Sequence, residues 1–162
     1  MSNHTAQYWI NHLNLLPHPE GGYYKEVYRS DHQITRIGSD KLKQACTSIY
    51  YLLEGNDFSG FHRIQSDELW YFHKGQPLLI HCINQQGDYF VMELSDKPSG
   101  NLSVAVEAGT WFSAEISSKS EFSLVSCNVA PGFEFAEFEM AHKQTLIVSY
   151  PQHSDLLNRL CR

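Results

Sequence analysis

The feature that most constrains this chain is a succession of short β-branched and aromatic runs separated by glycine- and proline-containing turns. Such runs predict strands, because these side chains suit a pleated sheet and the turn residues mark where the backbone reverses. The predicted strands cover residues 23–28, 47–53, 60–64, 68–73, 77–83, 89–94, 103–106, 110–116, 122–129 and 135–139. Because no helix separates them, they favour an antiparallel sandwich or barrel over a parallel sheet.

Helices are expected only near the two ends of the chain. Apolar residues recur at helical spacing within residues 5–15, behind Thr5, which is a suitable N-cap residue. Residues 151–160 are interpreted as a closing helix with proline in its first turn. With 162 residues and neither a repeat nor an interdomain linker, residues 1–162 are predicted to form a single domain.

Composition and charge exclude several classes of protein. The formal net charge is −6 and the 12 lysines and arginines are scattered, so no basic stripe can follow a nucleic acid backbone. No apolar run is long enough to span a bilayer, and the first residues lack a basic segment followed by an apolar one. A cytoplasmic location is therefore expected, and the four cysteines, which form no Cys-x-x-Cys pair, are interpreted as reduced.

One stretch near the middle of the sequence carries the most informative spacing. Alternation along a strand places His62 and Ile64 on one face, and a short turn can return Glu68 beside them. Glu68, Trp70 and Phe72 likewise share a face. If that face is interior, it predicts an aromatic pocket that holds one imidazole and one carboxylate.

This stretch resembles the first sequence motif of the cupin superfamily. In that motif a glycine precedes a His-x-His pair, and a glutamate and a further glycine follow. Gly55, His62, Glu68 and Gly75 match these positions, whereas Ile64 stands where the second histidine would be.

The second cupin motif, Pro-x-Gly-x-x-His, has its nearest match at residues 107–112, with Phe112 at the histidine position. Two of the usual metal ligands are therefore missing. His62 and Glu68 remain as candidate metal ligands, but alone they would hold a divalent metal weakly, because zinc and non-haem iron sites need at least one more protein ligand. No cofactor is expected.

Two further segments extend the resemblance. Residues 18–30 (HPEGGYYKEVYRS) and residues 128–138 (NVAPGFEFAEF) are similar to the cupin subfamily long described as a domain of unknown function, DUF985. The resemblance implies a jelly-roll barrel, also called a double-stranded β-helix, with a pocket similar to that of nucleotide-sugar epimerases. It also implies a homodimer, which the need to cover exposed sheet edges favours independently.

The candidate site residues follow from the spacing and the resemblance together. His62 would abstract a proton, Glu68 would hold its imidazole, and the phenol of Tyr50 would return a proton. Further candidates for contact with a ligand are Ser48, Trp70, Phe72, Phe112, Glu26 and Arg29. Core packing stays an alternative for the three aromatic residues, and Glu26 and Arg29 could equally form an exposed ion pair.

Three functions remain open at this point. The first is a metal-independent isomerase or epimerase that acts on a carbonyl-bearing sugar derivative. The second is a non-catalytic module that holds a metabolite for sensing or storage. The third, with the least support, is a metal-dependent oxygenase. In each case the expected partner is a small-molecule ligand.

Overall fold

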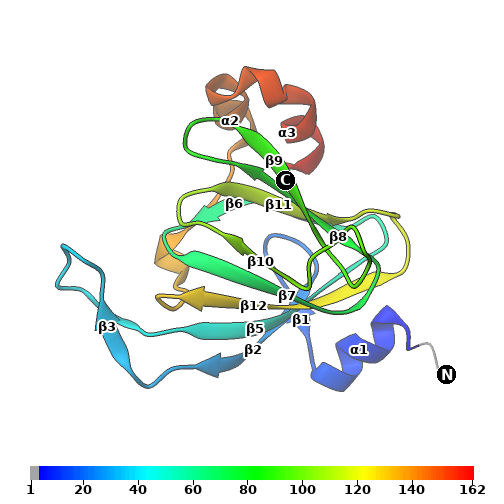
Figure 1. Ribbon diagram of the computed structural model, residues 1–162, viewed down its shortest axis with the longest axis horizontal. Coiled ribbons are helices and arrows are strands. Elements are labelled where there is room, and N and C mark those ends of the chain that lie inside the picture. Colours follow the sequence, from blue (N-terminus) through cyan, green and yellow to red (C-terminus); the bar gives the residue numbers. More distant parts are fainter. Residues whose placement is uncertain (1–3) are drawn as a thin grey trace.

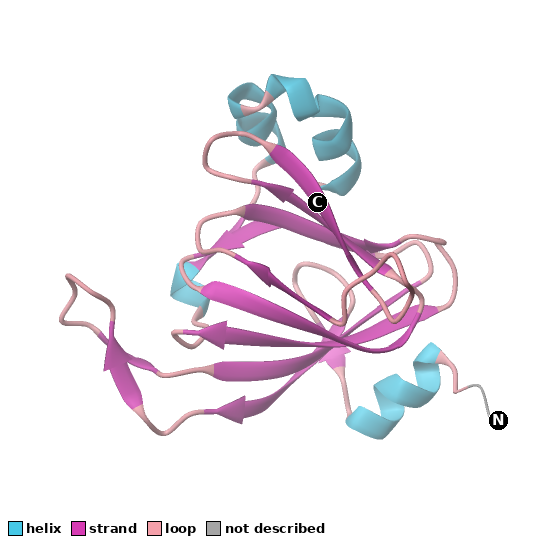
Figure 2. Cartoon of the chain, viewed as in Figure 1, coloured by secondary structure: helices cyan, strands magenta, loops and turns pink. Residues whose placement is uncertain are grey.

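The computed structural model describes residues 4–162, which fold mainly into strands in two antiparallel sheets (Figure 1 and Figure 2). One sheet has the order β1 (Leu16–Pro17), β2 (Tyr23–Arg29), β5 (Thr47–Glu54), β12 (Phe122–Ala130), β7 (Asp67–Gly75) and β10 (Ser103–Val106). The other has the order β13 (Phe138–Met140), β6 (Phe58–Ile64), β11 (Trp111–Ile116), β8 (Leu78–Ile83) and β9 (Tyr89–Leu94). The predicted mainly β, antiparallel jelly-roll architecture is confirmed.

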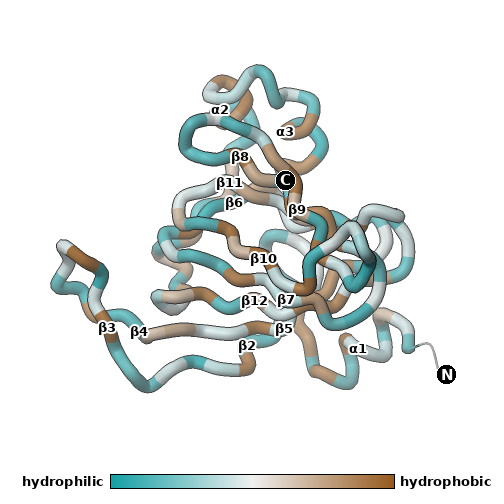
Figure 3. The backbone as a smooth tube through the Cα atoms, viewed as in Figure 1, coloured by the Kyte–Doolittle hydropathy of each residue, from teal (hydrophilic) through white to brown (hydrophobic). Residues whose placement is uncertain are grey.

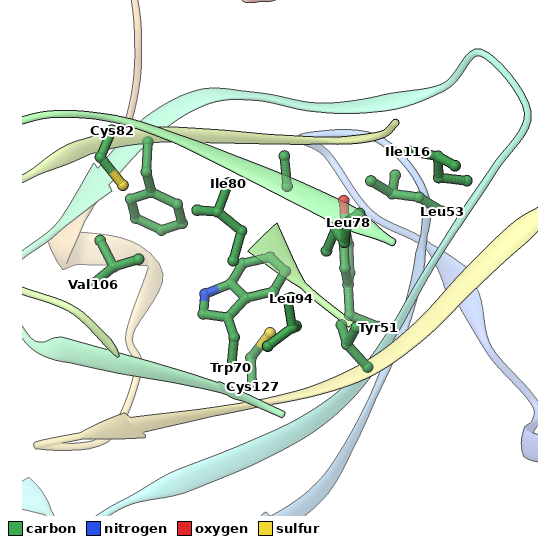
Figure 4. Packing of buried hydrophobic residues seen from close by; sticks show 13 residues of the cluster. Tyr51, Leu53, Trp70, Leu78, Ile80, Cys82, Leu94, Val106, Ile116 and Cys127 are labelled. Carbon is green, nitrogen blue, oxygen red and sulfur yellow. The ribbon is translucent and has the colours of Figure 1, made fainter. Parts of the chain in front are cut away.

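The main hydrophobic core lies between the two sheets, because alternate side chains of each strand point inward. Trp70, Tyr51 and Phe112 are its bulkiest members, and each is 1% exposed. Figure 4 shows the Trp70 indole beside Cys127, its partner in the ladder between β7 and β12. The connection between β8 and β9 is hydrophilic (Figure 3).

The predicted N-terminal helix is present as α1 (Ala6–Leu13). The Thr5 side chain accepts a hydrogen bond from the backbone N–H of Tyr8, as an N-cap residue should. The helix ends at Asn14, which adopts a left-handed conformation. Its apolar side packs on the outer face of the first sheet in a cluster that includes Ile10, Leu52 and Leu124.

The C-terminal segment covers the outer face of the second sheet. It contains α2 (Lys143–Ser149), a 3₁₀ turn η2 (Pro151–His153) and α3 (Ser154–Leu160). The expected closing helix is therefore present, but its first turn is 3₁₀, and the preceding helix α2 was not predicted. No helix within the described residues is long and apolar enough to cross a membrane.

Two further differences from the predicted strands matter for the site. A hairpin of β3 (Gln33–Thr35) and β4 (Leu42–Gln44) projects from the body between β2 and β5 (Figure 1). The predicted strand at residues 135–139 is wrong in its first part, which is the 3₁₀ turn η1 (Phe135–Glu137), and β13 begins only at Phe138. Because of the 3₁₀ turn, the ring centroids of Phe135 and Phe138 lie 6.1 Å apart. In an extended strand these two side chains would point to opposite faces.

Candidate functional site

A cavity of about 470 Å³ opens between β6 of one sheet and four strands of the other. Its lining residues come from the loop before β2, from β2, β5, β6, β7 and β12, and from the segment that follows β12. They are His18, Glu20, Tyr24, Glu26, Arg29, Thr47, Ile49, His62, Ile64, Glu68, Cys127, Val129, Phe133, Glu134, Phe135 and Phe138. A mostly apolar and aromatic cavity with a few convergent polar groups is typical of a small-molecule site.

His62 lies in this cavity and is only 3% exposed. Its Nδ1 lies 2.7 Å from the carbonyl oxygen of Gly60. Since a carbonyl can only accept, Nδ1 carries the proton and the neutral ring keeps a lone pair on Nε2. Burial lowers the pKa of His62 to about 4, so the ring is neutral at physiological pH.

The carboxylate that faces the His62 ring belongs to Glu20. Glu20 Oε2 lies 3.1 Å from His62 Nε2, and Glu20 Oε1 lies 3.7 Å from Nδ1 of His18. Burial raises the pKa of Glu20 to about 7. Below that pH the protonated carboxyl of Glu20 can donate a hydrogen bond to the Nε2 lone pair of His62.

Local backbone geometry fixes Glu20 in place. Gly21 and Gly22, which follow it, both have positive φ (113° and 68°), and a Cβ on Gly21 would lie 2.2 Å from the carbonyl oxygen of Phe58. Tyr51 donates its hydroxyl to the Gly21 carbonyl at 2.7 Å, and Nε of Arg162 donates to the Glu20 carbonyl at 2.7 Å. The two glycines therefore form the turn that enters β2, and this turn presents Glu20 to the cavity.

Glu68 is the second buried carboxyl of the cavity, 7% exposed. Burial, reinforced by the nearby charge of Glu20, raises its pKa to about 8, while a hydrogen bond with Cys127 acts in the opposite direction. Glu68 therefore keeps its proton at neutral pH. The sequence assigned Glu68 to hold the imidazole of His62, but the carboxyl that contacts this ring in the structure is that of Glu20.

The face of β5 that lines the cavity carries Thr47 and Ile49, not Ser48 and Tyr50. Tyr50 points to the opposite side and packs with the cluster under α1. The structure therefore does not bring Ser48 and Tyr50, two of the sequence candidates, to the cavity. The phenol that lines it is Tyr24 of β2, whose ring meets His18 edge-on at 4.5 Å.

The remaining sequence candidates divide between the core and the rim. Trp70 and Phe112 belong to the main core together with the partly buried Phe72. Phe112 still touches the site, because its ring centroid lies 4.1 Å from that of His62. Glu26 and Arg29 line the cavity as an ion pair with a shortest distance of 2.6 Å and side chains about 40% exposed.

The donor set does not fit a resident divalent metal. Both ring nitrogens of His62 already have partners, in Gly60 and Glu20, and the two positions where a cupin motif has further histidines hold Ile64 and Phe112. Within residues 4–162, no group of three or more histidine, cysteine, aspartate or glutamate side chains is arranged to hold a metal ion. The candidate pair His62 and Glu68 shares the cavity without forming such a group.

Comparison with known proteins agrees with this fold. The family model described as "Cupin superfamily (DUF985)" matches residues 7–141. The chain belongs to this family. No curated protein matched.

Solved structures place this cupin among relatives of the same length. A hypothetical protein from Leishmania major shares 34% identity with a TM-score of 0.91, and the match covers 98% of this chain and 99% of that one. A protein from Shewanella oneidensis shares 36% identity with a TM-score of 0.88, and the match covers 98% of each chain. Oxalate decarboxylase from Bacillus subtilis shares only 13% identity with a TM-score of 0.56, over 89% of this chain and 36% of that one, so it shows likeness of fold alone.

Proposed function

We propose that this cupin binds a small, sugar-like carbonyl compound and moves protons on it without a metal, as an isomerase or epimerase does. The observation that carries the proposal is the meeting, in one cavity, of the Glu20–His62 pair and the protonated carboxyl of Glu68. Buried carboxyl groups whose pKa values are raised toward neutral pH and that share a cavity are candidates for acid and base roles.

The chemistry divides between the two carboxyl groups. With a pKa of about 7, Glu20 is partly ionised at neutral pH and can take a proton from a carbon next to a carbonyl. The newly protonated carboxyl then donates to the lone pair on His62 Nε2, which stabilises it. Glu68, with a pKa of about 8, donates its proton to the carbonyl oxygen, and an enediol results. The two proton transfers are then reversed. Return of the proton to the neighbouring carbon gives an isomer, and return to the other face of the same carbon gives an epimer.

The rest of the cavity suits a ring with one apolar face. Phe133, Phe135 and Phe138 form an edge-to-face cluster with centroids 5.0 to 6.1 Å apart, and all three line the cavity. The Tyr24 phenol, on β2, can donate a hydrogen bond to a ligand oxygen. The pocket likeness to nucleotide-sugar epimerases that the sequence implies belongs to the same proposal.

Hydrogen exchange with solvent tests the proposal directly. The protein is incubated in D₂O with a panel of aldoses, ketoses, their phosphate esters and keto-sugar nucleotides, and NMR follows loss of the proton next to each carbonyl. We expect exchange with at least one class, and a reduction of about 10²- to 10⁴-fold in Glu20→Gln and Glu68→Gln. Glu107→Gln, an exposed carboxyl outside the cavity, is the matched control. Absence of both exchange and binding across the panel would overturn the proposal.

A non-catalytic binding module is the second candidate. The observation that favours it is the apolar surface around His62, where Ile64 and Phe112 take the motif's histidine positions. Tight binding of a panel member with no exchange, unchanged in Glu20→Gln, would support this reading over the first.

Three further expectations belong with this proposal: the protein works without a metal, acts in the cytoplasm and forms a homodimer. Stoichiometric iron or zinc that is retained through purification and lost in Glu68→Ala would contradict the first and favour an oxygenase. The homodimer is favoured by the edge strand β9, where Phe90 and Val91 are 42% and 43% exposed.

A further inference from the structure

The carboxyl groups that line the cavity outnumber its basic side chains. Four carboxyl groups line it, and Arg29 is the single lysine or arginine among the described lining residues. A ligand with a phosphate or other anionic group would therefore depend on Arg29, because guanidinium groups are the usual partners of such anions.

A β-bulge places Arg29 beside an acid of its own strand. The pairing of β2 with β5 shifts register between Glu26 and Tyr28. In a regular strand, residues three apart point to opposite faces, but the extra residue of a bulge turns Arg29 to the face of Glu26. Both side chains consequently line the cavity.

Glu26 fills the guanidinium fork of Arg29 in a bidentate arrangement. Nε of Arg29 donates to Glu26 Oε1 at 3.0 Å, and a terminal nitrogen donates to Glu26 Oε2 at 2.6 Å. Both terminal nitrogens also reach the carbonyl oxygen of Phe133 at 3.4 Å. The fork that would bind a phosphate already holds a carboxylate.

The carboxylates near Arg29 would repel an anionic ligand that took the place of Glu26 at the guanidinium group. The hydrogen bond to Glu26 is the main cause that raises the pKa of Arg29, and Glu134, which also lines the cavity, adds to it. A phosphate that displaced Glu26 would leave two carboxylates beside its own negative charge, on a chain whose net charge is already −6.

We propose that Glu26 sets the ligand class of this cavity: by occupying the fork of Arg29 it excludes sugar phosphates and nucleotide sugars and admits an uncharged carbonyl compound. The inference rests on the proposed function, since it concerns the ligand of the same cavity. The likeness to nucleotide-sugar epimerases suggests a ligand with a diphosphate. The role of Glu26 restricts the proposed ligands to compounds without one.

Titration with inorganic phosphate tests the role of Glu26 without knowledge of the natural ligand. ¹⁵N-labelled wild type, Glu26→Gln and Glu139→Gln are each titrated at constant ionic strength while NMR follows the Arg29 Nε–H and the backbone amides of the cavity. Glu139→Gln is matched, because Glu139 pairs with Arg63 at 2.7 Å on an exposed site outside this cavity. The side chain of Glu26 is 40% exposed, so its replacement leaves the core intact.

We expect phosphate to bind at Arg29 about tenfold more tightly in Glu26→Gln than in wild type. The reason is that phosphate no longer has to displace a carboxylate that is hydrogen-bonded to the guanidinium group. Glu139→Gln should leave the cavity resonances unchanged, and a second substitution, Arg29→Gln, should abolish the gain in Glu26→Gln. Equal phosphate binding by wild type and Glu26→Gln would overturn the inference.

A second titration separates this inference from the proposed function. Fructose and fructose 6-phosphate are compared on the same samples, and Glu26→Gln should shift the preference toward the phosphate ester. Solvent exchange with a nucleotide sugar in wild type would refute the role of Glu26 and leave the proton-transfer proposal standing. If Glu26→Gln binds phosphate more tightly but no panel compound exchanges its proton, the proton-transfer proposal is refuted and the role of Glu26 stands.

Discussion

Replacement of Glu68 by glutamine should make this protein more stable than wild type at alkaline pH. The amide imitates the protonated carboxyl in shape and hydrogen bonding but cannot ionise. In wild type, burial and the charge of Glu20 raise the pKa of Glu68 from 4.5 to about 8. The folded protein therefore holds a proton in this interval that the unfolded chain has released.

The sign and the size of the effect follow from linkage. Because the folded state binds more protons than the unfolded state, the contribution of Glu68 to stability is complete below about pH 4.5 and is lost as the pH rises to about 8. At about 1.4 kcal/mol for each pH unit, the interval corresponds to about 5 kcal/mol. That is a large part of the 5–15 kcal/mol that typically stabilises a domain.

Urea unfolding at a series of pH values between 4.5 and 8.5 measures this effect. The free energy of unfolding of Glu68→Gln, minus that of wild type, should rise with pH by up to about 5 kcal/mol. In a Glu20→Gln background the rise should be smaller, since the charge of Glu20 is the second cause of the raised pKa. Glu107→Gln, which replaces an exposed carboxyl outside the cavity, is the control variant. Parallel curves for wild type and Glu68→Gln would refute a protonated Glu68.

Three other outcomes are expected. Phe112→Ala should lower the free energy of unfolding by about 3–5 kcal/mol in urea, because the ring is 1% exposed in the core; a loss below about 1 kcal/mol would contradict that placement. Tyr24→Phe should lower kcat/KM for solvent exchange by about tenfold, the value of one ligand hydrogen bond, whereas Tyr50→Phe on the opposite face of β5 should not. Light scattering at micromolar concentrations should give the mass of a dimer, and a monomeric mass would refute self-association.

The sequence predicted the architecture well where strands carry a strong apolar pattern. The run 122–129 corresponds to β12 and the run 47–53 to β5, the two strands at the centre of the first sheet. It failed where tertiary contacts decide the backbone. Residues 135–139 were predicted as a strand, but the ion pairs of Glu137 with Arg36 and Lys43 accompany a 3₁₀ turn at residues 135–137 instead.

The site was only partly accessible to sequence reasoning. Strand alternation and the short turn after β6 bring His62 and Glu68 to one cavity, although β6 and β7 lie in different sheets. Glu20 is 42 positions from His62, and its burial depends on a loop held by Tyr51 and Arg162. A signal did exist: a glutamate between a proline and two glycines at a strand entrance is an unusual place for a charge.

Apolar residues at the two positions where the cupin motif has histidines agree with the direction of the pKa shifts in the cavity. A bound cation would stabilise ionised carboxylates and lower the pKa of Glu68. With Ile64 in the lining and Phe112 against the His62 ring, burial dominates instead: it lowers the pKa of His62 to about 4 and raises that of Glu68 to about 8. Ile64 and Phe112 at these two positions therefore accompany a neutral imidazole and a protonated carboxyl, the states on which the proposed proton transfer relies.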